Sequence, residues 1–179
     1  MPLNESWQTA EIPGPKKASL IMKPDIADAM IRRAKRPIMI VGHGIVEYDV
    51  EGIKLIDCLI DLATKSHIPV VVTASTNREF LSRGYTPAAL MPAVDIGNRL
   101  TDPHWKGFDG KDAYDLAIFV GLPYYMEWTI LSGLKHFAPQ LKTMTLDCVY
   151  QPNASWSFPN STIKDWVVNL KGIVDGLGD

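Results

Sequence analysis

Short runs of consecutive apolar residues recur along the chain, and most are bounded by glycine, proline or charged residues. An unbroken run is typical of a strand covered on both faces, as in a parallel sheet, rather than of a half-exposed antiparallel strand. Proline is tolerated near the start of such a strand, where Pro37 and Pro69 stand. We therefore predict strands at residues 38–41, 68–73, 114–121, 142–147 and 156–158.

Between these runs, apolar residues recur every three to four positions, as on one face of a helix. We predict helices at residues 24–36, 51–66, 124–138 and 162–177, and shorter helical pieces around 77–83 and 92–100. Residues 74–111 contain no clear strand pattern. A long irregular segment of this kind more often takes part in function or in an interface than serves only as a connection.

The alternation of strands and helices predicts an α/β fold in which helices cover both faces of a parallel sheet. We expect a three-layer, Rossmann-like, doubly wound sheet of about six strands, a class in which the order 3-2-1-4-5-6 is common. Residues 23–179 would form this single domain, because the chain of 179 residues is long enough for one substantial core and too short for two ordinary domains. Residues 1–22 lack periodicity and are predicted to form an extended N-terminal arm, whose Trp7 contacts the same domain or another subunit.

The composition excludes several classes of protein. An apolar content of 46%, a charged content of 21% and a net charge of -2 indicate a globular protein without electrostatic preference for nucleic acid or anionic membranes. The N-terminus lacks the basic and apolar blocks of a signal peptide, and no apolar run approaches the roughly 18 residues of a membrane span. We therefore expect a cytoplasmic protein that binds no nucleic acid and does not insert into a membrane.

Residues that bind metals or act as nucleophiles are few and scattered. The two cysteines, Cys58 and Cys148, cannot build a disulfide framework or a four-thiolate zinc or iron–sulfur site by themselves. The four histidines have no ligand-like spacing, and no Ser, Cys or Lys stands in a recognisable nucleophile motif. We expect no metal site, no catalytic residues and no catalysis by the chain alone.

Turns at the predicted carboxyl ends of three strands offer a candidate ligand site. Ligands of doubly wound sheets lie at these ends where the strand order reverses. In a sheet ordered 3-2-1-4-5-6, the turns after residues 38–41 and 114–121 would sit side by side. Backbone amides at glycine turns can bind phosphate, but the same glycines can also serve tight turns alone. His43, between two glycines, can donate to a phosphate or to a partner's backbone, or be an exposed turn residue. The candidate cofactor-binding residues are Gly42, His43, Gly44, Gly121, Leu122, Pro123 and Asp147.

The usual dinucleotide fingerprint is incomplete in this chain. Glu47 occupies the position of the third glycine, and the second strand ends at residues 73–76 without the acidic residue that would hold a ribose. NAD binding in the usual Rossmann manner is therefore not expected.

Aromatic residues crowd the start of the helix predicted at residues 124–138. Adjacent helical positions cannot all face inwards, so some of these side chains must lie on a surface or in a site. We hypothesise that this edge, together with the irregular residues 78–111, docks on a larger protein. The candidate partner-binding residues are Trp7, Trp105, Tyr124, Tyr125 and Trp128.

Three segments carry a family resemblance. They are residues 34–44 (Ala-Lys-Arg-Pro-Ile-Met-Ile-Val-Gly-His-Gly), 68–74 (Ile-Pro-Val-Val-Val-Thr-Ala) and 114–121 (Tyr-Asp-Leu-Ala-Ile-Phe-Val-Gly). In this order they resemble the middle domain of thiamine-diphosphate enzymes such as acetolactate synthase, which has the deoxyhypusine-synthase-like NAD/FAD-binding fold and in some of those enzymes holds FAD. Residues 108–110 are Phe-Asp-Gly rather than the Gly-Asp-Gly of a thiamine site, and the zinc cysteines of sirtuins, which share the fold, are missing. Thiamine and deacylase chemistry are therefore not expected.

With its Trp-containing arm and the Pro-Gly-Pro segment at residues 13–15, the whole chain resembles the epsilon-subunit family of the archaeal acetyl-CoA decarbonylase/synthase (carbon monoxide dehydrogenase) complex. The resemblance implies an accessory subunit that binds and stabilises the large nickel–iron–sulfur catalytic subunit in an alpha2-epsilon2 assembly. That component acts in reversible CO oxidation and in acetyl-CoA cleavage or synthesis, as in methanogenesis from acetate.

The resemblance also implies that the nickel–iron–sulfur clusters belong to the partner subunit only, and that the chain assists electron transfer to FAD. The alternative is an FAD- or nucleotide-binding electron-transfer module. Its ligand would lie at the crevice of Gly42, Gly44 and Gly121, with Asp147 near a ribose or adenine.

Overall fold

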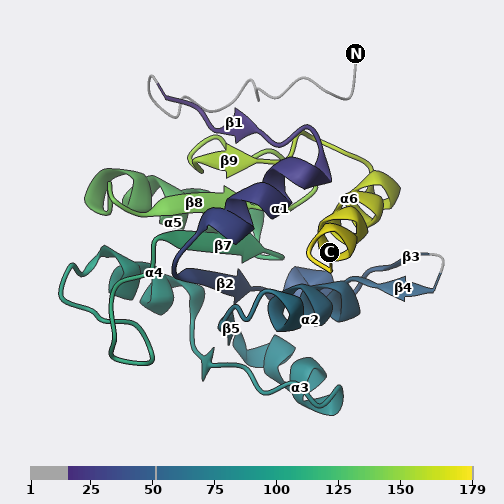
Figure 1. Ribbon diagram of the computed structural model, residues 1–179, viewed down its shortest axis with the longest axis horizontal. Coiled ribbons are helices and arrows are strands. Elements are labelled where there is room, and N and C mark those ends of the chain that lie inside the picture. The colour runs from purple at the N-terminus through teal and green to yellow at the C-terminus, as the bar shows by residue number, and fades with distance from the viewer. Residues whose placement is uncertain (1–15, 51, 179) are drawn as a thin grey trace.

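A seven-stranded parallel sheet runs through the centre of the computed structural model, which describes residues 16–50 and 52–178 (Figure 1). Its order is β1-β9-β8-β7-β2-β5-β6, and each neighbouring pair is parallel. Without β1, the other six strands have the 3-2-1-4-5-6 order that is common among doubly wound sheets. The strands are β1 (Ser19–Leu20), β2 (Pro37–Val41), β5 (Val70–Val72), β6 (Ala89–Leu90), β7 (Leu116–Val120), β8 (Lys142–Thr145) and β9 (Trp156–Ser157).

Helices on both faces of the sheet complete three layers. The helices α1, α2 and α6 pack on the face nearer the viewer in Figure 1, and α4 and α5 pack on the other. The helices are α1 (Pro24–Arg33), α2 (Leu55–Lys65), α3 (Ala74–Ser82), α4 (Ala93–Thr101), α5 (Tyr124–Phe137) and α6 (Ile163–Gly176). A 3-10 turn, η1 (His43–Ile45), and a small antiparallel pair, β3 (Asp49–Val50) with β4 (Ile53–Lys54), connect β2 to α2. The three-layer, Rossmann-like fold is thus confirmed.

The described helices include none that is both long enough and apolar enough to cross a membrane.

The two central strands, β2 and β7, explain the unbroken apolar runs. Met39 and its register partner Ile118 belong to the core under α1, α2 and α6, whereas Ile40 and Phe119 belong to the core under α4 and α5. All four side chains are fully buried, and burial of each contributes roughly 1.5–3 kcal/mol to folding. Because both faces are covered, these strands need an apolar residue at every position.

Several helix boundaries differ from the sequence-based prediction, and two of the differences have a clear local cause. Helix α1 ends at Arg33 and not at residue 36, because the Asp115 carboxylate accepts the backbone N–H groups of Lys35 (2.8 Å) and Arg36 (2.9 Å) in place of helical carbonyls. Helix α2 begins at Leu55 and not at residue 51, because β3 and β4 form a hairpin before it.

Two short strands of the main sheet, like the β3–β4 pair, were not predicted. Strand β6 lies within the segment expected to lack strands, and β1 lies within the segment predicted as an arm. Both are edge strands of two residues, held by backbone hydrogen bonds such as that from Ser19 to the Ser155 carbonyl (3.0 Å). Trp7 and the rest of residues 1–15 lie outside the described part of the chain, so the arm and its boundary at residue 22 stay predictions.

Candidate functional site

The turns that follow β2 and β7 lie against each other at the carboxyl ends of the sheet, as the topology predicts. The Gly42 N–H donates to the Val120 carbonyl (2.9 Å) and the Gly44 N–H to the Gly121 carbonyl (2.9 Å). A Cβ at Gly42 would lie 2.2 Å from the Gly121 carbonyl oxygen. Gly121 has a φ of +75°, and a Cβ there would lie 2.6 Å from Ile45 Cγ2. Close packing of the two loops therefore requires glycine at both positions.

A dinucleotide pyrophosphate binds to free backbone N–H groups at a turn of this kind. Here the amides of Gly42 and Gly44 already donate within the protein, and the loop at Gly121 fills the space beside Gly42. These residues do not fit a pyrophosphate bound in the usual Rossmann manner, and the geometry favours the tight-turn interpretation of the glycines. FAD binding in another manner stays a prediction.

The remaining sequence-predicted site residues surround the same turns. The His43 side chain is exposed at the start of η1, Leu122 is buried, and Pro123 is the N-cap of α5. Asp147 follows β8, and its Oδ1 accepts the Gly121 N–H (2.8 Å). The structure thus brings the three predicted turns together, with His43 facing solvent. A ligand-binding role for each of them stays a prediction.

A small pocket opens between these turns and the first turn of α5. Its volume is about 170 Å³, below the roughly 300–1,000 Å³ of typical sites for drug-sized ligands. Most of its walls are apolar or aromatic, and none of the described residues that line it is Lys, Arg or His. The lining residues are Gly44, Tyr48, Gly121, Leu122, Tyr124, Glu127, Asp147, Cys148, Val149, Gln151 and Trp166. This volume does not admit a whole flavin dinucleotide.

Two carboxyl groups meet at this pocket. Glu127, on the inner side of α5, is 0% exposed and neighbours Asp147. Burial raises the pKa of Glu127 well above its usual value, and the Asp147 charge adds to this effect. Burial also raises the pKa of Asp147, against the opposing effects of the neighbouring Glu127 carboxyl and of the Gly121 amide, which donates to Asp147 Oδ1. Sequence reasoning missed Glu127, because an acidic residue in the first turn of a helix is ordinarily an exposed partner of the helix dipole.

A second hollow, the α4–α5 groove, lies between those two helices and has a volume of about 460 Å³. Tyr125 (71% exposed), Phe137 (74%) and Val94 (51%) are its most exposed large side chains. The described residues that line it are Val94, Gly97, Asn98, Thr101, Tyr125, Met126, Thr129, Ile130, Gly133, Leu134 and Phe137. None of these residues is charged, which is unusual for so exposed a surface.

Comparison with known proteins identifies the family of this chain. The family model described as "CO dehydrogenase beta subunit/acetyl-CoA synthase epsilon subunit" matches residues 1–174. The chain belongs to this family. The acetyl-CoA decarbonylase/synthase complex subunit epsilon of Methanothermobacter thermautotrophicus is 39% identical over 165 residues, which cover 89% of this chain and 88% of the relative. Subunit epsilon 1 of the complex in Archaeoglobus fulgidus is 35% identical over 181 residues (98% and 94%), and subunit epsilon in Methanothrix soehngenii is 35% identical over 155 residues (86% and 80%).

Three of the partner-binding candidates of this epsilon-subunit family member lie on or near the exposed side of α5. Tyr125 is exposed in the α4–α5 groove, whereas Tyr124 and Trp128 are half-buried. Their backbone carbonyls accept hydrogen bonds from Gln151 Nε2 (3.2 Å, to Tyr124) and Asn153 Nδ2 (3.4 Å, to Trp128). Partner contact by each of them stays a prediction.

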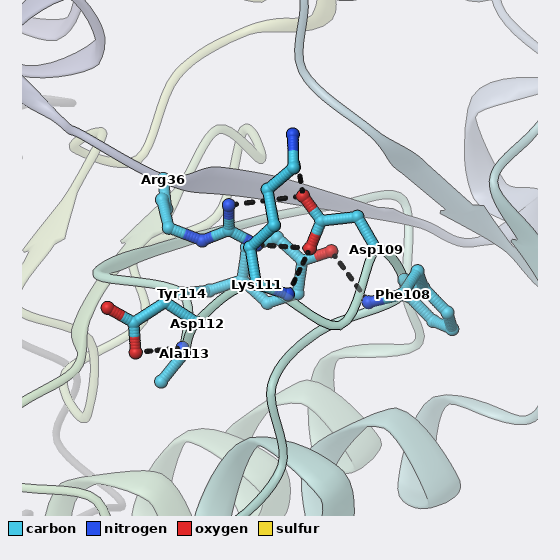
Figure 2. Close-up of polar contacts among 7 residues, drawn as sticks. All are labelled: Arg36, Phe108, Asp109, Lys111, Asp112, Ala113 and Tyr114. Atoms are coloured by element: carbon cyan, nitrogen blue, oxygen red, sulfur yellow. Dashed lines mark hydrogen bonds and ion pairs between the residues drawn. The ribbon is translucent and has the colours of Figure 1, made fainter.

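Trp105, the fourth described candidate, is half-buried in an intramolecular aromatic cluster. Its ring makes edge contacts with Phe108 at a centroid distance of 5.2 Å and a tilted contact with Tyr114 at 5.6 Å. Figure 2 shows the ion pair beside this cluster, in which Arg36 binds both carboxylate oxygens of Asp109 (2.6 and 3.2 Å). The Arg36 guanidinium lies 5.3 Å from the Tyr114 ring centre, and the Tyr114 hydroxyl accepts the Phe108 N–H (3.3 Å). The cluster fixes the loop before β7 against the start of β2.

A wider cavity of about 790 Å³ lies beside this ion pair, at the amino ends of β2 and β5. Arg36 and Asp109 on its wall already form an ion pair with each other. Ligands of doubly wound sheets lie at the opposite, carboxyl ends of the strands. For these two reasons we place the candidate ligand site at the pocket of Glu127 and Asp147.

The Asp109→Asn variant should lose part of the acid sensitivity of the fold. The Arg36 hydrogen bond, with further help from Lys111, lowers the pKa of Asp109 from 3.8 to about 2. A carboxylate whose pKa is lowered on folding stabilises the protein above its unfolded pKa, and that contribution is lost as the pH falls from about 3.8 to about 2. Thermal melts at pH 2–5 should therefore show a slightly smaller drop for the variant than for the wild type.

The matched control is Asp102→Asn, because Asp102 lies at the start of the same loop, accepts the His104 N–H (2.9 Å) and is not among the groups whose charges act on Arg36. An equal change in both variants would contradict a specific role for the Arg36–Asp109 pair.

Proposed function

We propose that the chain is a non-catalytic subunit that binds and stabilises the large nickel–iron–sulfur catalytic subunit of a CO dehydrogenase component in the cytoplasm. Membership of the family supports a place in such a complex, since the relatives bear the names of subunits of the acetyl-CoA decarbonylase/synthase complex. The observation that carries the proposal is the uncharged, aromatic α4–α5 groove.

The composition of the groove matches the central part of a protein–protein interface. Such centres are depleted in charged residues and enriched in Tyr, Phe and Met, which the groove supplies as Tyr125, Phe137 and Met126. The lining also includes polar, uncharged side chains such as Asn98 and Thr101. These can form hydrogen bonds with a partner's backbone, and no charged group has to lose its water when the interface forms. We infer that the catalytic subunit inserts an apolar segment here.

Assembly is tested by mixing the purified chain with the catalytic subunit and measuring mass by size-exclusion chromatography with light scattering. We expect co-elution at the mass of two copies of each chain, and slower thermal inactivation of CO oxidation when this chain is present. Failure of both tagged and tag-free chains to co-elute at micromolar concentration would overturn the proposal. Co-elution in another ratio would overturn the alpha2-epsilon2 stoichiometry alone.

A flavin- or nucleotide-binding electron-transfer role is the second candidate, because Gly44, Gly121 and Asp147 line a pocket where Rossmann-like sheets bind ligands. The backbone amides of Gly42 and Gly44 already donate within the protein, and the pocket is small. Both observations favour the first candidate. Fluorescence titration with FAD, of the isolated chain and of the complex, separates the two. Saturable quenching would support the electron-transfer role, and its absence in both samples would exclude it.

A further inference from the structure

An unusual number of buried oxygen atoms without partners gathers at the carboxyl end of β8. Both oxygens of Glu127, Thr145 Oγ1, Asp147 Oδ2 and Gln151 Oε1 are shielded from solvent and have no hydrogen-bond partner among the described residues. The other three side chains all neighbour the Glu127 carboxyl. Buried polar atoms are almost always paired in native proteins, so a cluster of five calls for a missing donor.

The missing partner must donate hydrogen bonds or carry positive charge, because the cluster itself offers acceptors. Gln151 is oriented by its Nε2, which donates to the Tyr124 carbonyl (3.2 Å), so its Oε1 is left for the cluster. The two carboxyls add up to two negative charges, and the pocket that they line contains no cationic residue. A single proton shared by Glu127 and Asp147, with the Thr145 hydroxyl as a second donor, would still leave Gln151 Oε1 without a partner.

The rest of the pocket limits the shape of this partner. Tyr48, Leu122, Val149 and Trp166 give it apolar and aromatic walls, which suit an alkyl stem and interact favourably with a cation. A volume of about 170 Å³ lies below that of sites for drug-sized ligands, so the stem is short. A hydrated metal ion would leave most of these apolar walls without contact.

We propose that this pocket binds an ammonium or guanidinium group on a short apolar stem, with Glu127, Asp147 and Gln151 as its acceptors. The group belongs either to a free small amine or to a Lys or Arg side chain of the catalytic subunit, and the second source rests on the proposed function. Tyr124 lines the pocket and its neighbour Tyr125 lines the α4–α5 groove, so the first turn of α5 joins the two surfaces.

The first arm of the test uses the isolated full-length chain with n-propylguanidinium and n-butylammonium as probes, followed by NMR and calorimetry. We expect saturable binding that the Glu127→Gln variant weakens by at least about 30-fold, as is typical when one partner of a buried charge pair is removed. The variant should fold and melt at the same or a higher temperature, because it replaces a buried carboxyl that lacks a partner by an amide of nearly the same shape. Weaker binding by a more stable protein cannot be attributed to misfolding.

The matched control is Glu47→Gln, which removes the same charge from an exposed residue three positions after Gly44 and outside the pocket lining. It should leave probe binding unchanged. If the wild type binds neither probe, or if both variants weaken binding equally, the proposal is wrong. Binding of Mg²⁺ in place of both probes would also overturn it.

The second arm identifies the source of the cation by measuring the affinity of the catalytic subunit for the wild type and Glu127→Gln. A partner side chain predicts a loss of about 30-fold and competition by n-propylguanidinium. Unchanged affinity together with probe binding assigns the pocket to a free small amine. If the wild type does not bind the catalytic subunit, the proposed function fails, but the first arm still decides whether the pocket binds cations.

Discussion

Replacing Gly42 with alanine is expected to destabilise the domain by about 4 kcal/mol or more, a large share of the roughly 5–15 kcal/mol of a typical domain. The new Cβ would lie 2.2 Å from the Gly121 carbonyl oxygen and 2.7 Å from the Leu122 amide nitrogen. Both are backbone atoms next to the central strand β7, so neither can move without disturbing the sheet. Urea denaturation monitored by circular dichroism would measure the loss, or soluble expression would fail altogether.

A graded series of glycine variants controls for the added methyl group. A Cβ at Gly44 would lie 2.9 Å from the Gly121 carbonyl oxygen, so Gly44→Ala should be less harmful than Gly42→Ala. At Gly133, inside α5, a Cβ meets nothing within 4 Å, and Gly133→Ala should stabilise the fold by about 0.5–1 kcal/mol. If the Gly42→Ala variant is as stable as the wild type, the two loops can separate. The turn would then regain room for a ligand.

The sequence predicts the centre of the sheet better than its edges, for a physical reason. Strands β2 and β7 are covered on both faces, so each residue must be apolar and the pattern is visible. Strands β1 and β6 have two residues each and lie at the edges, where backbone hydrogen bonds to a neighbouring strand define them. The spacing of apolar side chains in the sequence does not depend on such backbone bonds, so it cannot predict these strands.

The same difference applies to the candidate site. The juxtaposition of Gly42 with Gly121 follows from the strand order alone, and the structure confirms it. The burial of Glu127 depends on how α5 lies against the loop after β8, which contributes Asp147 and Gln151. No local pattern distinguishes this glutamate from an exposed acid at the start of a helix. Phe137 was missed because it keeps the apolar spacing of α5, yet it stands 74% exposed at the end of that helix.

The Tyr125→Asp and Phe137→Asp variants should each weaken binding of the catalytic subunit by about 30-fold or more. Aromatic residues that become buried at the centre of an interface commonly contribute 2 kcal/mol or more, and a buried, unpaired aspartate adds a desolvation penalty. Both side chains are more than two-thirds exposed in the free chain, so the fold should keep its stability within about 0.5 kcal/mol. Calorimetry or surface plasmon resonance with the catalytic subunit would measure the loss.

Two further variants separate a blocked groove from a general effect on the surface. Gly133→Met places a side chain into the open α4–α5 groove without adding charge, and it should lower affinity while the helix becomes more stable. Val168→Asp is the matched control, because Val168 is 61% exposed on α6, which covers the opposite face of the sheet. If Val168→Asp weakens binding and the three groove variants do not, the catalytic subunit docks on the α6 face. The groove would then need another explanation for its lack of charge.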